Sequence, residues 1–215
     1  MSIIPLSRTL RRAPLIVAAA LWLATTAASA QSPQGEALIT ALRQGGYVIV
    51  MRHPSSPFTA PDQSQADPAN TKLERQLDDK GRKTSQQMGE AFRKLHIPVG
   101  QIFTSPTYRA REAVRLMDLG SAQSAPELDE GAQGMQGNAD KSHSDWLQRA
   151  AATAPRTATN TLLVTHTPNL TGAFGALAKD VSAGEALIFH PKGTGQPELT
   201  ARVKIEEWAR LADAQ

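Results

Sequence analysis

The chain has 215 residues, with 23 lysines and arginines, 20 aspartates and glutamates, and no cysteine. Without cysteine, disulfide bonds, thiolate catalysis and a lipid-modified cysteine are excluded. The formal net charge of +3 is small for this length, so the composition gives no reason to expect nucleic acid as a partner.

The first 30 residues have the pattern of a secretory signal peptide. Arg8, Arg11 and Arg12 precede an apolar stretch at 15–24, and Ala28-Ser29-Ala30 supplies a cleavage pattern of small residues. We expect cleavage after Ala30, which places the mature protein in the periplasm or outside the cell. An uncleaved N-terminal anchor is the alternative, and both the general secretory and the twin-arginine export routes stay open.

The mature chain, residues 31–215, is predicted to be one neutral domain. The leader contains three of the 23 basic residues and none of the 20 acidic ones, which leaves 20 of each. We therefore expect no nucleic-acid partner and no stable membrane insertion after cleavage. The remaining length is enough for a single core that needs no disulfide bonds.

Hydrophobic periodicity predicts an alternation of helices and short apolar strands. Helices are expected at 32–44, from an N-cap at Asp78 to about 95, from a cap at Ser105 to 117, around 145–152, from a cap at Thr167 to Leu177, and at 205–211. Strands are expected at 47–51, 102–103, 125–128, 161–165, 186–189 and 199–203. The polar stretch at 54–74 is predicted to be a loop. The pattern indicates an α/β fold, a three-layer sandwich with a mostly parallel central sheet flanked by helices.

Three of these strands end at polar residues. They are followed by Arg52-His53-Pro54, by Thr104-Ser105-Pro106 with Arg109 beyond it, and by His166-Thr167-Pro168. Because the carboxyl ends of parallel strands meet at one edge of a sheet, two histidines and two arginines are expected to converge beside helix N-termini. Helix N-termini favour anions, and guanidinium groups match phosphoryl oxygens in pairs. The pattern therefore indicates a phosphate site.

The motifs, in this order, resemble those of the histidine phosphatase superfamily, which has the phosphoglycerate-mutase-like fold. The resemblance rests on Arg52-His53, Leu77-Asp78-Asp79-Lys80-Gly81-Arg82, Thr104-Ser105-Pro106-Thr107-Tyr108-Arg109-Ala110-Arg111-Glu112 and Leu163-Val164-Thr165-His166. Together these segments span nearly the whole mature chain. The stretch from Thr165 to Asn169 and the tail from Gly184 to Trp208 most resemble exported bacterial members.

The resemblance implies a phosphomonoester hydrolase that forms a phosphohistidine and uses no metal or other cofactor. His53 would attack phosphorus, Arg52 and Arg109 would hold the phosphoryl oxygens, and His166 would donate a hydrogen bond or charge to them. The substrate would be a small phosphomonoester. Export and family together suggest a sugar phosphate or a lipopolysaccharide-core phosphate, and a scavenging phosphatase of broad specificity fits equally well. Protein partners cannot be read from the sequence.

The leaving alkoxide needs a proton, for which many relatives use a glutamate in a Leu-x-Glu-x-x-x-Gly context. The segment that begins at Leu128 has this form and makes Glu130 the candidate general acid. Glu127 and Asp129 are rivals, and some short relatives lack a glutamate donor.

Pro54 departs from the family pattern, which commonly has glycine after the nucleophilic histidine. Proline has no N–H to offer a phosphate and restricts the residue before it to extended conformations. The hydroxyls or amides of Ser55 and Ser56 could bind the phosphate in its place.

Three other functions compete with the phosphatase. A metallohydrolase would use histidines as ligands, but the five histidines show no paired ligand spacing. A non-catalytic phosphate-ligand-binding protein would use the same fold and arginines, and it would tolerate loss of His53. A phosphoglycerate mutase is disfavoured because its substrates belong to the cytoplasm. We assign no catalytic role to the remaining histidines or to Tyr108.

Overall fold

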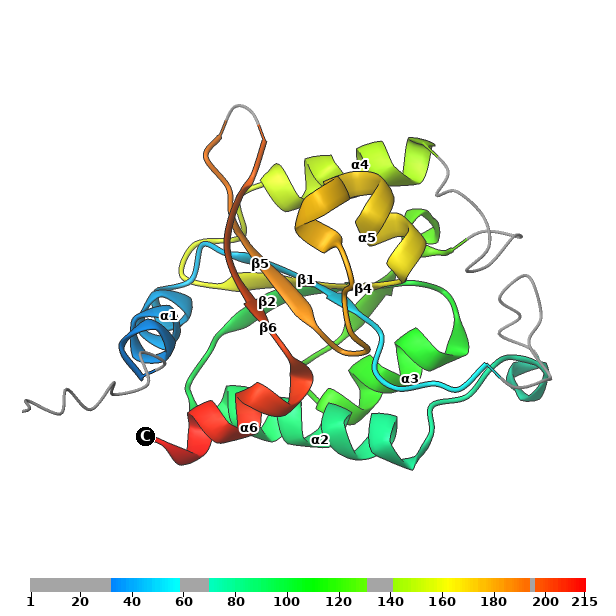
Figure 1. The fold of residues 1–215 in the computed structure, drawn as a ribbon, viewed down its shortest axis with the longest axis horizontal. Helices are drawn as coiled ribbons and strands as arrows, with labels where there is room; N and C mark the ends of the chain where they lie inside the picture. The colour runs from blue at the N-terminus through cyan, green and yellow to red at the C-terminus, as the bar shows by residue number, and fades with distance from the viewer. Residues whose placement is uncertain (1–31, 59–69, 131–140, 194–195) are drawn as a thin grey trace, which may run out of the picture. The chain divides into compact units, whose positions relative to one another are not determined.

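The computed structural model describes residues 32–58, 70–130, 141–193 and 196–215 (Figure 1). The expected signal peptide at 1–30 lies outside these residues. So do residues 59–69 of the predicted loop and the glycine-rich segment at 131–140. In the part of the chain that is described, no helix is long and apolar enough to cross a membrane.

A six-stranded sheet of order β3-β2-β4-β1-β5-β6 forms the centre of the fold (Figure 1). Its parallel strands are β1 (Val48–Arg52), β2 (Val99–Thr104), β3 (Ala122–Ser124) and β4 (Asn160–Thr165). The last two, β5 (Ala186–His190) and β6 (Glu198–Val203), form the predicted hairpin, and β5 pairs antiparallel with β1. The predicted α/β fold with a mostly parallel sheet is confirmed. Because β4 lies between β1 and β2, the carboxyl ends of these three strands are neighbours.

Helices cover both faces of the sheet. One face carries α4 (Lys141–Ala152) and α5 (Thr167–Phe174), and the other carries α2 (Asp79–Lys94), α3 (Tyr108–Met117) and α6 (Ile205–Asp213) (Figure 1). The first helix, α1 (Ser32–Gln44), packs into the second of these layers. Alternate residues of β1 face opposite cores: Ile49 and Met51 join the layer of α2, and Val50 joins that of α5. Burial on both faces explains why this strand is apolar without interruption.

Two predicted helix boundaries are confirmed by their capping geometry. The side chain of Asp78 caps α2 by accepting a hydrogen bond from the Gly81 amide at 2.6 Å. At the end of α1, Gly45 and Gly46 have φ values of 80° and 92°, which glycine adopts without the strain of a Cβ atom. The termini of α1 are those expected.

Two predicted caps are wrong. The N-cap of α3 is Thr107 and not Ser105, because the Ser105 hydroxyl accepts from the Thr107 amide in the turn before the helix. The N-cap of α5 is His166 and not Thr167, which is already helical. The connection between strand and helix therefore contains His166 before α5, and before α3 it contains Ser105, which contacts His166.

The strand expected at 125–128 is also wrong. The strand β3 ends at Ser124, and Pro126–Leu128 forms a single 3-10 turn, because Pro126 has no N–H for a strand ladder. Leu177 does not continue the apolar stripe of α5. That helix ends at Gly175, whose φ is 52°, and Leu177 is 46% exposed.

In its described part, the predicted loop at 54–74 contains one short regular element, a 3-10 turn at Thr71–Leu73.

Candidate active site

His53 follows β1 directly and is 2% exposed. Its Nδ1 atom lies 2.8 Å from the carbonyl oxygen of Pro54. Because a carbonyl oxygen only accepts, Nδ1 carries the proton and Nε2 has the lone pair. The Nε atom of Arg109 donates toward this Nε2 at 3.4 Å. The arrangement leaves His53 with an unprotonated ring nitrogen that faces a cation.

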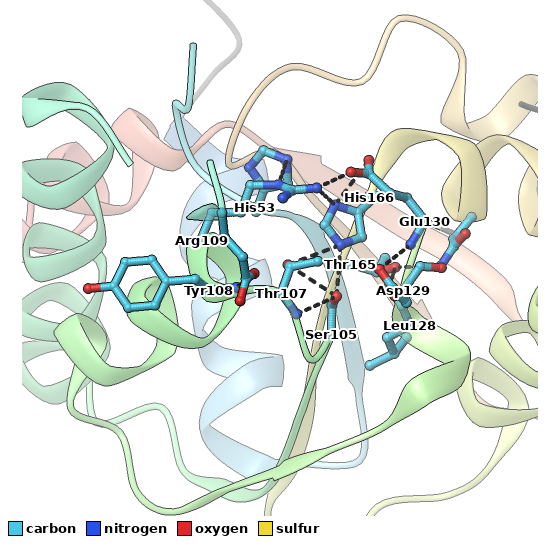
Figure 2. A network of polar contacts seen from close by, with 12 residues as sticks. His53, Ser105, Thr107, Tyr108, Arg109, Leu128, Asp129, Glu130, Thr165 and His166 are labelled. Atoms are coloured by element: carbon cyan, nitrogen blue, oxygen red, sulfur yellow. Dashed lines mark hydrogen bonds and ion pairs between the residues drawn. The ribbon is translucent and has the colours of Figure 1, made fainter. Parts of the chain in front are cut away.

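Arg109 links the three other groups of the site (Figure 2). It lies in the first turn of α3 and is 2% exposed. Its Nη2 atom forms an ion pair with Glu130 and lies 3.3 Å from Nδ1 of His166. Tyr108, the preceding residue, points away from the histidines in Figure 2. The guanidinium group thus lies between both histidines and the carboxylate.

His166 is fully buried and lies between Arg109 and Ser105. Since a guanidinium only donates, Nδ1 of His166 accepts from Arg109, and Nε2 then donates to Ser105 Oγ at 2.8 Å. The Ser105 hydroxyl donates in turn to Thr107 Oγ1 at 3.2 Å. The rings of His53 and His166 meet edge to face with centroids 5.1 Å apart. Ser105 therefore fixes which nitrogen of His166 faces the site.

Glu130 is the acidic residue that reaches this cluster (Figure 2). One of its oxygens pairs with Arg109, and Oε2 lies 3.5 Å from His166 Nδ1. This Oε2 is buried and has no hydrogen-bond partner among the described residues. Of the rival acids, Asp129 uses its carboxylate to accept from the Glu130 amide at 2.8 Å. The structure therefore brings Glu130 together with Arg109 and His166.

Arg52 and Arg75 add positive charge around the histidines. Arg52 donates from Nη1 to the Val181 carbonyl at 3.1 Å, and its buried Nε has no partner in the described part of the chain. Arg75 is 3% exposed and precedes α2. Among the described residues, the charges of three guanidinium groups act on the histidines and the Glu130 carboxylate contacts His166, an excess of positive charge that suits a phosphate dianion and disfavours a metal cation. Sequence reasoning missed Arg75.

Burial, followed by the charge of Arg109, lowers the pKa of His53 well below its ordinary value of 6.5. The same two causes, in the same order, lower the pKa of His166 well below 6.5. Arg75 and Arg52 also act on both rings in this direction. Both histidines are therefore neutral near pH 7 in the absence of a bound anion, and His53 has the lone pair that a nucleophile needs.

Solved structures with this arrangement of strands and helices include phosphatases. The protein histidine phosphatase SixA complexed with tungstate matches with a TM-score of 0.53 and 18% identity, over 75% of this chain and 98% of that one. The chain has the histidine phosphatase fold. A phosphoserine phosphatase mutant from Entamoeba histolytica, in complex with phosphoserine, matches with a TM-score of 0.51 and 11% identity, over 74% of this chain and 98% of that one. No protein-family model and no curated protein matches the sequence.

Within this histidine phosphatase fold, Asn169 holds the segment that presents Glu130. Its Nδ2 donates to the Asp129 carbonyl at 2.8 Å and to Thr165 Oγ1 at 3.0 Å. Thr165 Oγ1 donates to the Leu128 carbonyl at 2.8 Å. Asn169 was visible in the motif after His166, but its bonds join segments about 40 residues apart, which no local pattern reveals.

The chain around Pro54 is positioned by the N-terminus of α2. The Asp78 amide donates to the Ser55 carbonyl at 3.2 Å, and Ser55 Oγ donates to Asp78 Oδ2 at 2.7 Å. Ser56 Oγ donates to the Gln76 carbonyl at 2.7 Å. Both hydroxyl groups therefore donate to the segment before α2. These contacts do not support the idea that the two hydroxyls replace a phosphate-binding N–H at Pro54.

Gly81 permits this packing, because a Cβ atom there would lie 2.1 Å from the Ser55 carbonyl oxygen. We expect Gly81→Ala to displace the chain next to His53 and to lower activity on any phosphomonoester about tenfold or more, beyond its cost in stability. Gly89→Ala is the matched control. Its Cβ would meet the Met117 carbonyl at 1.8 Å, in the same helix but at the α3 contact. Equal activity in the two folded variants, measured as kcat/KM, would contradict the prediction.

The neutral histidines also predict how stability depends on pH. Their pKa values are lower in the folded protein than in the unfolded chain, so the unfolded chain binds more protons and stability falls as the pH drops below 6.5. Well below that value each histidine contributes a loss of about 1.4 kcal/mol per pH unit until its folded pKa is reached. Denaturant titrations at about pH 7.5 and about pH 5.5 measure this loss.

Carboxylates do not explain a loss in that window. Asp78 and Glu185 have lowered pKa values, with ordinary values of 3.8 and 4.5, so their contribution is lost only at more acid pH. His53→Asn should therefore reduce the slope between the two pH values, whereas His190→Ala, at an exposed position, should leave it unchanged. A free energy of unfolding that is the same at both pH values would contradict the buried neutral state.

Proposed function

We propose that this chain is an exported phosphomonoesterase that works through a phosphohistidine on His53. The observation that carries the proposal is the unprotonated Nε2 of His53, buried against the Arg109 guanidinium inside a cluster with excess positive charge. A nucleophile with a free lone pair and fixed cations for the phosphoryl oxygens are what phosphoryl transfer requires. The histidine phosphatase fold supports the same reading.

The proposed reaction has two steps, transfer of the phosphoryl group to His53 and its release to water. Nε2 of His53 attacks phosphorus, and the bond from phosphorus to the ester oxygen breaks while Arg52 and Arg109 stabilise the charge on the phosphoryl oxygens. Glu130 leaves Arg109 to the phosphoryl group, takes up a proton from solvent and gives this proton to the departing alkoxide. Water then attacks the phosphohistidine and gives a proton to Glu130. The N–P bond breaks, phosphate leaves, and His53 regains its lone pair.

Arg75 is assigned to the same anion site as a further positive charge. Its burial and its effect on the pKa of both histidines support this assignment. His166 Nδ1 faces the site as an acceptor in the resting state. It becomes a donor when it takes a proton, which a bound phosphate dianion favours by raising its pKa. This is how His166 would contribute charge to the phosphoryl oxygens.

We further infer that the reaction needs no metal. Three guanidinium groups around the histidines repel a cation. Among the described residues, no group of three or more His, Cys, Asp or Glu side chains could hold a metal ion. The assigned roles use only side chains of this chain.

The proposed substrate is a small phosphomonoester met outside the cytoplasm, with a sugar phosphate or a lipopolysaccharide-core phosphate as the leading class. The signal-peptide pattern at 1–30 supports a periplasmic or secreted location. The neutral charge of residues 31–215 supports a small ester over nucleic acid or an anionic membrane surface. A broad scavenging activity remains within the same reaction class.

A non-catalytic phosphate-ligand-binding protein is the second candidate. The ion pair between Arg109 and Glu130 favours it, because a carboxylate paired with a guanidinium accepts hydrogen bonds and is not placed as a proton donor. Hydrolysis of nitrophenyl phosphate and a panel of sugar phosphates by the purified protein, with a chelator present, separates the two. We expect turnover that survives chelation and an acid-labile phosphoenzyme on His53. Tight phosphate binding without turnover on any ester would favour the binding protein, and turnover abolished by the chelator would refute the metal-free reaction.

A further inference from the structure

Two chain segments that lie side by side, 53–58 and 73–78, lead from the buried His53 to solvent, and we call this pair of segments the ribbon. The segment after His53 lies beside the segment that precedes α2, with Ser55 bonded to Asp78 and Ser56 bonded to Gln76. One step further out, the Arg75 guanidinium lies over the ring of Phe58, 5.3 Å from its centroid. The ribbon therefore leads in five residues from His53 to Phe58.

Phe58 ends this ribbon as an exposed aromatic ring. It is 71% exposed, more than the other large apolar side chains in the described ranges. Leu73, which is 40% exposed, lies on the other segment of the same ribbon, two residues before Arg75. The Phe58 ring thus stands in water against an arginine whose charge reaches both catalytic histidines. A large exposed apolar ring next to a polar site indicates a ligand contact.

We propose that Phe58 is a specificity-determining platform for the leaving group of the substrate. The proposal rests on the phosphatase function and adds the class of substrate to it. The phosphoryl group lies at His53 and Arg109, and a leaving group that carries a ring extends along the ribbon and stacks on Phe58. A sugar ring and an aromatic base share the flat face that such stacking needs. The other face of the Phe58 ring is held by Arg75, which fixes its orientation.

The test compares three phosphomonoesters that differ in the leaving group. Glycerol 3-phosphate has no ring, glucose 6-phosphate has a sugar ring, and adenosine monophosphate has an aromatic base. We expect Phe58→Ala to raise KM about tenfold for at least one of the two ring-bearing esters, with kcat and the KM of glycerol 3-phosphate unchanged. The ester that responds identifies which ring is bound, and Phe58→Trp should restore its KM.

Leu177→Ala is the matched control, because Leu177 is also exposed but lies between α5 and β5. It should leave all three KM values unchanged. Equal KM values for wild type and Phe58→Ala on all three esters would overturn the proposal. A uniform loss on all three would also overturn it, because it would assign Phe58 to holding Arg75 and not to the leaving group.

A binding measurement separates this inference from the phosphatase function itself. Calorimetry with methylphosphonate, cyclohexylphosphonate and phenylphosphonate reports a preference for a ring whether or not any ester is hydrolysed. We expect a wild-type preference for a ring-bearing phosphonate that Phe58→Ala loses, while tungstate binds both proteins equally. If wild type turns over no ester but shows this preference, the function fails and the platform stands. If turnover occurs without the preference, the platform fails alone.

Discussion

Replacement of His53 is expected to abolish phosphatase activity while the protein stays folded. His53→Ala removes the unprotonated Nε2 that faces Arg109, so kcat/KM on nitrophenyl phosphate should fall at least about 1,000-fold. His53→Asn is the sharper variant. Its side-chain amide can donate to the Pro54 carbonyl, as Nδ1 of the histidine does, but offers no nucleophile. Both variants should fail to form an acid-labile phosphoenzyme.

His190→Ala provides the control for these variants. His190 is exposed at the end of β5 and stacks on Tyr47, away from the site, so activity should change less than about twofold by the usual scale for surface substitutions. His53→Asn should still bind tungstate, because Arg52 and Arg109 remain. If His53→Asn retained activity within about tenfold of wild type, the phosphohistidine mechanism would be wrong.

Much of the fold could be predicted because hydrophobic patterns and helix-end residues, which are local in the sequence, determine it. The apolar run of β1 is buried on both faces, and Gly45, Asp78 and Gly81 mark helix ends through backbone geometry that few residues adopt. Errors arose where a long-range contact overrode a local preference. Ser105 has the residue type of an N-cap, but its hydroxyl serves His166, 61 residues away, and the helix starts at Tyr108.

Some residues of the candidate site could likewise be predicted from the sequence, and others could not. His53, Arg109 and His166 could be placed from the sequence because each follows a strand whose parallel neighbours bring the three ends together. Arg75 could not, since it follows no strand and its burial depends on the packing of the segment before α2. Pro54 illustrates the limit of motif reasoning. Its missing N–H drew attention, whereas in the structure its carbonyl oxygen holds His53 in the tautomer with an unprotonated Nε2.

Glu130→Gln is expected to change binding and catalysis in opposite directions. In the resting structure the Glu130 carboxylate occupies the guanidinium edge of Arg109 that a phosphoryl group needs. A neutral amide competes less well for Arg109, so tungstate should bind about tenfold more tightly to the variant. The same variant cannot donate the carboxyl proton, so kcat for an alkyl phosphate should fall about 100-fold or more.

A comparison of alkyl and aryl phosphates shows whether the loss of kcat comes from the missing proton donor. Nitrophenolate departs without a proton, so kcat for nitrophenyl phosphate should fall less than about tenfold in Glu130→Gln. Such a split requires Glu130 to be the proton donor. Its Oε2 is buried, lies 3.5 Å from His166 Nδ1 and has no hydrogen-bond partner among the described residues.

Glu127→Gln is the matched control for Glu130→Gln, because Glu127 lies in the same segment and was a rival for the acid. It should change neither tungstate affinity nor the ratio of alkyl to aryl turnover. Equal losses on both esters in Glu130→Gln would show that Glu130 only positions Arg109. A split that appears in Glu127→Gln instead would move the general acid three residues along the chain. Tighter tungstate binding together with the split assigns both roles to Glu130, which must leave Arg109 before it can protonate the leaving group.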